Sequence, residues 1–122
     1  MSRTAAPREF PHYFFVEGGA LAVENGMKAA FDWKVRKNLA AGRPAGGNQI
    51  LHFEQAFHGR AGYTLSVTNT DPTKTLHFPK FDWPRIVAPR TRFPIAAHLD
   101  EIVESERASL AALASTIRVT IS

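Results

Sequence analysis

Gly18 and Gly19 lie where an apolar run meets a helical pattern, a place at which exposed backbone can bind an anion. The preceding residues, Tyr13 to Val16, are strong β-formers, and helical periodicity begins at Ala20. The first amide N–H groups of a helix have no partner within it, so they can hold a phosphate without a cationic side chain. Small residues also let a phosphate approach the backbone closely. A plain strand-to-helix turn would use the same glycines, and the motif alone fits both interpretations.

A second group of potential binding residues, AFHGR, occupies Ala56 to Arg60. An aromatic side chain followed by glycine offers a flat face to a ring, with an imidazole and a guanidinium close by. The alternative is structural. Phe57 would then belong to the core, His58 would be a hydrogen-bonded polar group, and Arg60 would be a surface charge.

The elements around these motifs predict a βαβ unit, and therefore an α/β fold. A short buried strand is expected over His12 to Glu17, followed by a helix from Ala20 that ends before the Gly- and Pro-rich loop beginning at Ala40. A second strand is expected over Ile50 to Phe53, parallel to the first through a right-handed crossover. Ligands of such units bind beyond the carboxyl ends of the strands, which is where the glycine pair lies.

The first predicted helix has an apolar and a polar face. Its apolar face comprises Leu21, Met27, Ala30, Phe31, Val35 and Leu39. Its polar face comprises Glu24, Lys28, Asp32 and Arg36, which form two acid-before-base pairs four residues apart. The two tryptophans, Trp33 and Trp83, are expected to anchor the packing.

The rest of the chain predicts helices separated by an irregular section. A short helix is expected over Ala61 to Val67, and a second long one over Ile95 to Leu113. Between them, five prolines favour an extended, packed loop. The β-branched tail STIRVTIS predicts the start of a third strand. Residues 1–12 contain Pro7 and Pro11 and are expected to form a loose leader.

Composition narrows the class of protein. The chain has 122 residues, enough for one domain or a piece of one, and no apolar run approaches the ~18 residues that cross a bilayer. Its net charge of +4 is spread along the sequence without a nucleic-acid-binding motif, so no nucleic-acid partner and no membrane are expected. The five histidines have no metal-ligand spacing, and cysteine is absent, so no metal is expected. A cytoplasmic location is the simplest interpretation.

The two motifs, in this order and at this separation, resemble the class III aminotransferases, which depend on pyridoxal phosphate and have fold type I. The segments FFVEGGALAVEN, KAAFDWK, AFHGRAGYTLSVTNT and FPKFDWPRI are most similar to the lysine 6-aminotransferase branch of that family. The resemblance extends from about Phe14 to Ile86. It implies a portion of a large domain with a mostly parallel sheet, residues 1–122 being an incomplete domain.

The resemblance also implies roles for particular residues. Gly19 and Ala20 would donate backbone N–H groups to the cofactor phosphate, and Phe57 would stack on the pyridine ring. Arg60 would bind the substrate carboxylate, for which a planar guanidinium is better suited than an ammonium group. The substrates implied are L-lysine and 2-oxoglutarate, and the complete enzyme is expected to be a homodimer. The segment Phe78 to Ile86 would lie near the cofactor and the subunit interface.

Other features of the family have no counterpart in this sequence. The family's Schiff-base lysine, the aspartate that pairs with the pyridine nitrogen and a second substrate arginine belong to later sequence. None of the five lysines has the context of the Schiff-base lysine, so the chain alone is expected to be inactive and no catalytic residue is assigned. The alternative is a non-catalytic remnant or partner-binding module without cofactor chemistry.

Overall fold

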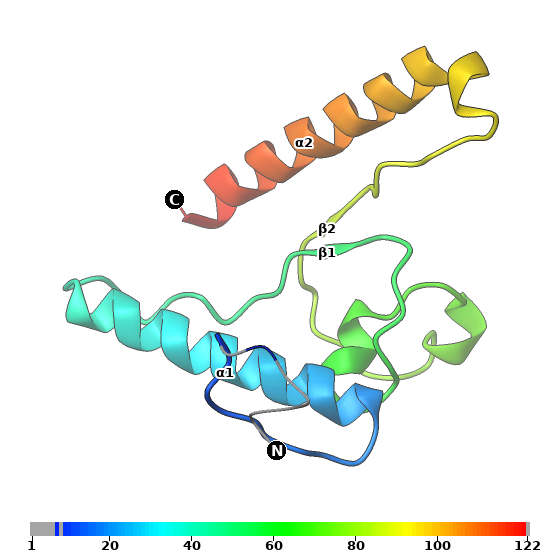
Figure 1. Cartoon of the computed structure of the whole chain (residues 1–122). Coiled ribbons are helices and arrows are strands. Elements are labelled where there is room, and N and C mark those ends of the chain that lie inside the picture. Colours follow the sequence, from blue (N-terminus) through cyan, green and yellow to red (C-terminus); the bar gives the residue numbers. More distant parts are fainter. Residues whose placement is uncertain (1–6, 8, 122) are drawn as a thin grey trace.

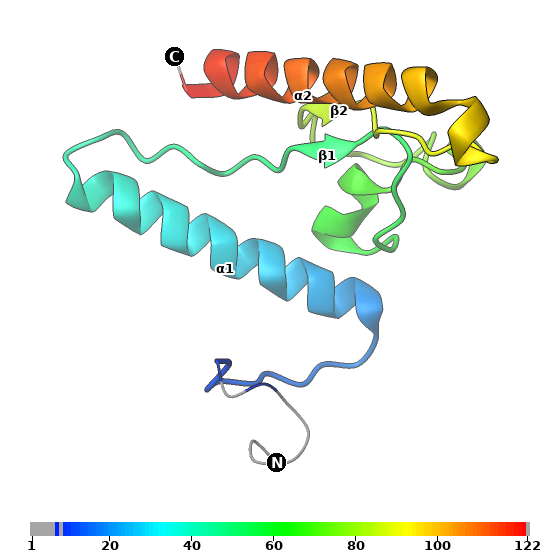
Figure 2. The same cartoon turned by 45° about the horizontal axis from the view of Figure 1, so that its top comes forward.

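The computed structural model describes residue 7 and residues 9–121, in which two long helices lie on either side of a short pair of strands (Figure 1). Helix α1 spans Gly19–Ala40 and helix α2 spans Leu99–Ile121. Strands β1, His52–Phe53, and β2, Arg85–Ile86, run between them. Figure 2 shows the same order after rotation, with α2 on one side of the strand pair and α1 on the other. No helix in the described part of the chain is both long and apolar enough to cross a membrane.

Helix α1 confirms the first predicted helix, including its end. Both predicted ion pairs form, with Lys28 Nζ 3.4 Å from Glu24 Oε1 and Arg36 Nε 2.8 Å from Asp32 Oδ2. At the C-terminal end the chain turns at Gly42, whose φ of 69° suits glycine. The predicted apolar face was too broad. Met27 is buried, whereas Leu21 and Leu39 at the two ends of the face are exposed.

The strands form a parallel pair, but they are not the pair that the sequence predicted. His52 is in register with Arg85, and Phe53 with Ile86. The prediction of a strand over His12 to Glu17 was wrong, because these residues form no strand and Phe14 and Phe15 are exposed. The βαβ unit with helix α1 as its crossover is therefore not formed. Strand β1 confirms the second half of the predicted strand at Ile50 to Phe53 and pairs with β2, which the sequence did not predict.

A small aromatic core joins α1 to the irregular part of the chain. The Phe81 and Trp83 rings are stacked, with centroids 5.0 Å apart, and Phe31 and Tyr63 pack around Trp83 at 5.7 and 5.9 Å. Trp83 is buried, as expected of a packing anchor. Trp33 is not an anchor in this structure, because its side chain is exposed and Lys37 Nζ lies 4.8 Å from its ring centroid.

Helix α2 is longer than the sequence predicted. It is preceded by a single 3-10 turn, η3, at Ile95–Ala97, and then continues to Ile121. The predicted third strand in the tail is therefore wrong, although Ser122 lies outside the described residues. Two serines fasten α2 to the chain after β2: Ser109 Oγ donates to the Val87 carbonyl at 2.7 Å, and Ser105 Oγ accepts from the Arg90 N–H at 3.0 Å.

The section between the two strands is largely irregular, as its prolines indicate. It contains two 3-10 helices, η1 at Gly62–Val67 and η2 at Pro72–Lys74. Helix η1 confirms the predicted short helix at Ala61 to Val67. The predicted leader falls mostly on residues 1–6 and 8, which lie outside the described residues; residues 9–12 form neither helix nor strand.

Candidate functional site

The start of helix α1 has the features of an anion site that the sequence indicated. Gly18 precedes the helix with a φ of 92°, and its carbonyl accepts the first hydrogen bond of the helix, from the Ala22 N–H at 3.1 Å. No side chain of the described residues caps this end, and the first turn contains no acidic residue. The amides of the first turn thus have no partner within the helix, and their partial positive charge is not neutralised by a carboxylate.

The segment Ala56 to Arg60 follows β1 as an ordered loop. The hydroxyl of Thr68 accepts a hydrogen bond from the His58 N–H at 2.9 Å and donates one to the Gly59 carbonyl at 2.6 Å. The Asn69 N–H donates to the Ala56 carbonyl at 2.8 Å. Thr68 is almost fully buried, with 1% of its surface exposed, so these hydrogen bonds are protected from water. The residues just after η1 therefore fix the backbone that presents Arg60.

The two predicted motifs lie against each other. Gly59 has a φ of 108°, and a Cβ at this position would stand 2.4 Å from the Cβ of Ala20 and 3.0 Å from its Cα. Only glycine permits this approach, so the loop rests directly on the first turn of α1. The chain thus brings the start of α1, at Ala20, into contact with the loop that carries Phe57 and Arg60.

The side chains of this loop are open to solvent. Phe57 is 60% exposed, which contradicts the structural alternative that placed it in the core. Arg60 is also exposed, and it has no ion pair within the described part of the chain. The Phe57 ring and the Arg60 guanidinium are therefore open to solvent on a loop whose Gly59 rests on the first turn of α1.

Sequence reasoning missed the contact between Glu24 and Gly62. The helical pattern placed Glu24 on the polar face of the helix, but its side chain is only 13% exposed. A Cβ on Gly62, whose φ is 31°, would lie 2.4 Å from Glu24 Oε2. Periodicity could not reveal this contact, because it depends on where η1 packs; the second glycine of the segment HGRAGY was the available signal.

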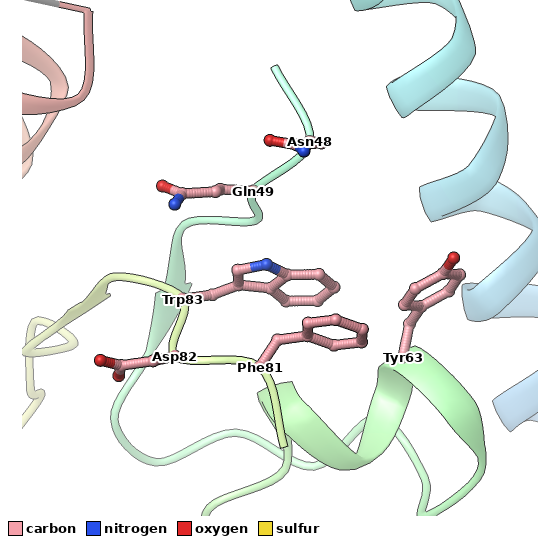
Figure 3. A pocket seen from close by; sticks show the side chains of 6 residues that line it. All are labelled: Asn48, Gln49, Tyr63, Phe81, Asp82 and Trp83. Atoms are coloured by element: carbon pink, nitrogen blue, oxygen red, sulfur yellow. The ribbon is translucent and has the colours of Figure 1, made fainter. Parts of the chain in front are cut away.

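A pocket of about 370 Å³ lies on the aromatic core. Figure 3 shows the stacked Phe81 and Trp83 rings in it, with Tyr63 from η1 beside them and Asn48 and Gln49 on the chain that leads to β1. The segment Phe78 to Ile86, which the resemblance placed near the cofactor, thus contributes Phe81 and Trp83 to packing against Phe31 of α1 and Tyr63 of η1. Ser66 Oγ accepts from the Phe81 N–H at 3.0 Å and holds the segment there.

One buried titratable group stands near the binding loop. His52 in β1 is 6% exposed, and burial lowers its pKa from the usual value, with smaller contributions from the positive charges of Arg85 and His58. Its Nδ1 lies 3.2 Å from the Ile50 carbonyl, and its buried Nε2 has no hydrogen-bond partner among the described residues. Burial therefore favours the neutral form of this imidazole over the charged form. Within residues 7 and 9–121 no cluster of three metal-binding side chains occurs.

Comparison with known proteins assigns the chain to a family. Residues 3–121 match the family model of the class III aminotransferases, and the chain belongs to that family. It is 55% identical over 108 residues to the L-lysine-epsilon aminotransferase of Amycolatopsis lactamdurans, covering 88% of this chain and 24% of that protein. It is 65% identical over 92 residues to the enzyme of the same name from Mycobacterium tuberculosis, covering 75% of this chain and 20% of that protein.

Solved structures agree with the sequence relatives. The lysine aminotransferase of M. tuberculosis in the internal aldimine form superposes with a TM-score of 0.90 at 50% identity, covering 98% of this chain and 27% of that structure. The chain thus spans about a quarter of the length of the relatives it matches. The predicted resemblance is confirmed, and so is a fold that combines helices with parallel strands.

Proposed function

We propose that this chain forms the part of an L-lysine ε-aminotransferase that binds the phosphate of pyridoxal phosphate and the carboxylate of lysine. The observation that carries the proposal is the contact of Gly59 with Ala20, because it sets the loop of Arg60 on the uncapped start of α1. The lysine aminotransferases among the relatives support the choice of substrate. In this proposal the chain is a portion of a fold type I large domain and acts in a cytoplasmic homodimer.

The residues present fit this cofactor. The N–H groups of Gly19 and Ala20 have the polarity that a phosphate dianion needs, and no carboxylate in the first turn opposes it. The exposed face of Phe57 offers a surface on which a pyridine ring can stack. When bound, pyridoxal phosphate supplies the electron sink for amine transfer, from lysine to 2-oxoglutarate in this case.

Arg60 is assigned to the substrate. A bidentate pair between its guanidinium and the α-carboxylate of lysine would hold the amino acid by one end and leave the terminal amine extended. The charged donors of Arg60 are free of ion pairs in the described structure, so no internal carboxylate has to be displaced. Nothing in the described residues or in the comparisons favours the alternative of a partner-binding module.

Titration of the isotope-labelled chain tests this proposal. Pyridoxamine phosphate should shift the amide resonances of Gly19 and Ala20, and pyridoxamine without the phosphate should not. A stable phosphopyridoxyl-lysine adduct, which adds the carboxylate arm, should in addition shift the side-chain Nε–H resonance of Arg60. Equal responses to both pyridoxamine compounds would contradict the assignment of the helix start. The chain alone is still predicted to perform no transamination.

A further inference from the structure

The loop that carries Arg60 contacts α1 at two points, and both contacts depend on glycine. Gly59 meets Ala20, and Gly62 meets the carboxylate of Glu24, whose two oxygens would lie 2.4 and 2.6 Å from a Cβ at position 62. Ala20 and Glu24 are four residues apart and therefore lie one above the other on the same side of the helix. Arg60 stands in the chain between the two points of contact.

Glu24 occupies this position at an energetic cost. Its side chain is 13% exposed, and its buried Oε2 has no hydrogen-bond partner in the described part of the chain. Burial of a carboxylate with an unsatisfied oxygen is unfavourable. Lys28 partly compensates this cost, because its Nζ lies 3.4 Å from Glu24 Oε1. The same Nζ is 5.9 Å from the ring centroid of Tyr63, the residue that follows Gly62 in η1.

We propose that Glu24 is a positioning residue that acts through Gly62 as a spacer between α1 and η1. The bulk of its carboxylate sets how closely Gly62 approaches the helix, and this sets how far Arg60 stands from the amides of Gly19 and Ala20. A change in that separation would alter how well a ligand with a phosphate at one end and a carboxylate at the other reaches both groups. The inference rests on the proposed function, because it assigns Glu24 to selecting the length of the amino acid bound between the two groups.

The Glu24→Ala variant of the 122-residue chain tests the spacer. The quantity measured is the ratio of affinities for the phosphopyridoxyl-lysine adduct and for pyridoxamine phosphate, which isolates the contribution of the carboxylate arm. Loss of one charge-assisted contact should lower this ratio about tenfold. Pyridoxamine phosphate itself should bind as before, because α1 supplies those amides alone. A merely structural loss of stability would weaken both ligands together.

Two matched variants separate the spacer from other effects. Glu24→Gln keeps the size of the side chain and should keep the wild-type ratio, whereas Gly62→Ala intrudes on the same contact and should lower it. Asp32→Ala removes an exposed carboxylate of the same helix and should change nothing. Wild-type ratios in both E24A and G62A would overturn the inference.

A measurement without ligand keeps the inference distinct from the proposed function. The methyl group of Ala20 and the α-protons of Gly59 should show a nuclear Overhauser effect in the wild-type chain and in E24Q. Its intensity should change in E24A, because Gly62 can move toward α1 once the spacer is removed and Gly59 moves with it. An unchanged effect in E24A refutes the spacer even if both ligands bind. If neither ligand binds the wild-type chain but E24A changes the effect, the spacer stands and the proposed function fails.

Discussion

Thr68 makes two hydrogen bonds that shape the loop of Arg60, and valine has nearly its volume without the hydroxyl. Thr68→Val should therefore destabilise the chain by roughly 1–3 kcal/mol, because two part-buried hydrogen bonds, one from the His58 N–H and one to the Gly59 carbonyl, are lost. Urea unfolding followed by circular dichroism measures the change. Thr70→Val at an exposed neighbouring position is the control and should cost much less. Equal effects of T68V and T70V would argue against an ordered loop.

His52 should make the stability of the chain depend on pH. Burial lowers the pKa of its imidazole in the folded state, while the unfolded chain titrates near the usual value of about 6.5. Between these two values the unfolded state binds more protons, so stability is complete above about pH 6.5 and declines as the pH falls through the folded pKa. Urea unfolding at several pH values measures the slope.

His52→Gln removes the titrating group, so the free energy of unfolding should decline less steeply below about pH 6.5. His77→Gln, at an exposed position, is the matched control and should leave the slope in place. A profile that is equally steep in H52Q would mean that the acid sensitivity comes from other residues. Burial is the largest cause of the lowered pKa, and it makes His52 the expected origin of the acid sensitivity.

At the scale of the elements, helix α1 contains an avoidable weakness at Gly26. This residue is exposed in mid-helix, and a Cβ there would meet no atom within 4 Å. Gly26→Ala should therefore raise the free energy of unfolding by about 0.5–1 kcal/mol. The midpoint of urea unfolding measures this gain. Gly47→Ala should have the opposite sign, since Gly47 has a φ of 107° and its Cβ would collide with the Lys34 side chain.

Helix α1 and the strand expected at His12 to Glu17 differ in how well the local sequence could predict them. Helix α1 was predictable because its apolar residues, its i,i+4 ion pairs and its glycine boundary are all features of one continuous segment. The prediction of a strand at His12 to Glu17 failed, because a strand needs a neighbouring strand and none of the described residues pairs with this segment. Strong β-formers alone do not make a strand.

Strand β2 and the C-terminal tail also show that local pattern alone does not decide whether a segment forms a strand. Strand β2 was hidden because it directly follows Pro84, which has no N–H; yet the Pro84 carbonyl accepts from the His52 N–H at 3.1 Å and helps to start the pairing. In the tail, the β-branched residues continue α2, where Thr116 Oγ1 bonds back to the Ala112 carbonyl at 2.8 Å. The pairing of β2 with β1 and the continuation of α2 both depend on residues outside the short segment from which each prediction was made.

The two motifs of the candidate site lie in contact, whereas the predicted pair of strands does not form. Gly19, Ala20 and Arg60 were chosen from two short motifs, and the structure brings those motifs into contact at Gly59. The roles of these residues toward ligands stay predictions. Glu24 and Thr68 were not recognised, because each acts on the loop across a tertiary contact between segments distant in sequence.

At the scale of the whole molecule, the chain exposes more surface than a compact protein of its size. Its accessible surface is 9597 Å², whereas a folded monomer of 13.5 kDa exposes about 6500 Å² by the usual scaling. The buried apolar residues in the described part are few: Met27, Val67, Trp83 and Ile86. Much of the remaining apolar surface is of the kind that proteins normally cover with further structure or with a partner.

This surface predicts that the isolated chain associates with itself. Phe14 and Phe15 are each 77% exposed on the segment before α1, and each strand of the β1–β2 pair has an edge that no described strand covers. We expect sedimentation velocity to show a sedimentation coefficient that rises with protein concentration. Replacing both residues in Phe14→Ser/Phe15→Ser should lower the associated fraction, because adjacent apolar rings are removed from water on association.

Phe93→Ser is the matched control, since Phe93 is also 77% exposed but stands apart, before η3. Its effect on association should be smaller than that of the double variant, because it removes one isolated ring and leaves the adjacent pair intact. Circular dichroism of all three proteins establishes that the helices are retained. A monomer at every concentration would contradict the prediction.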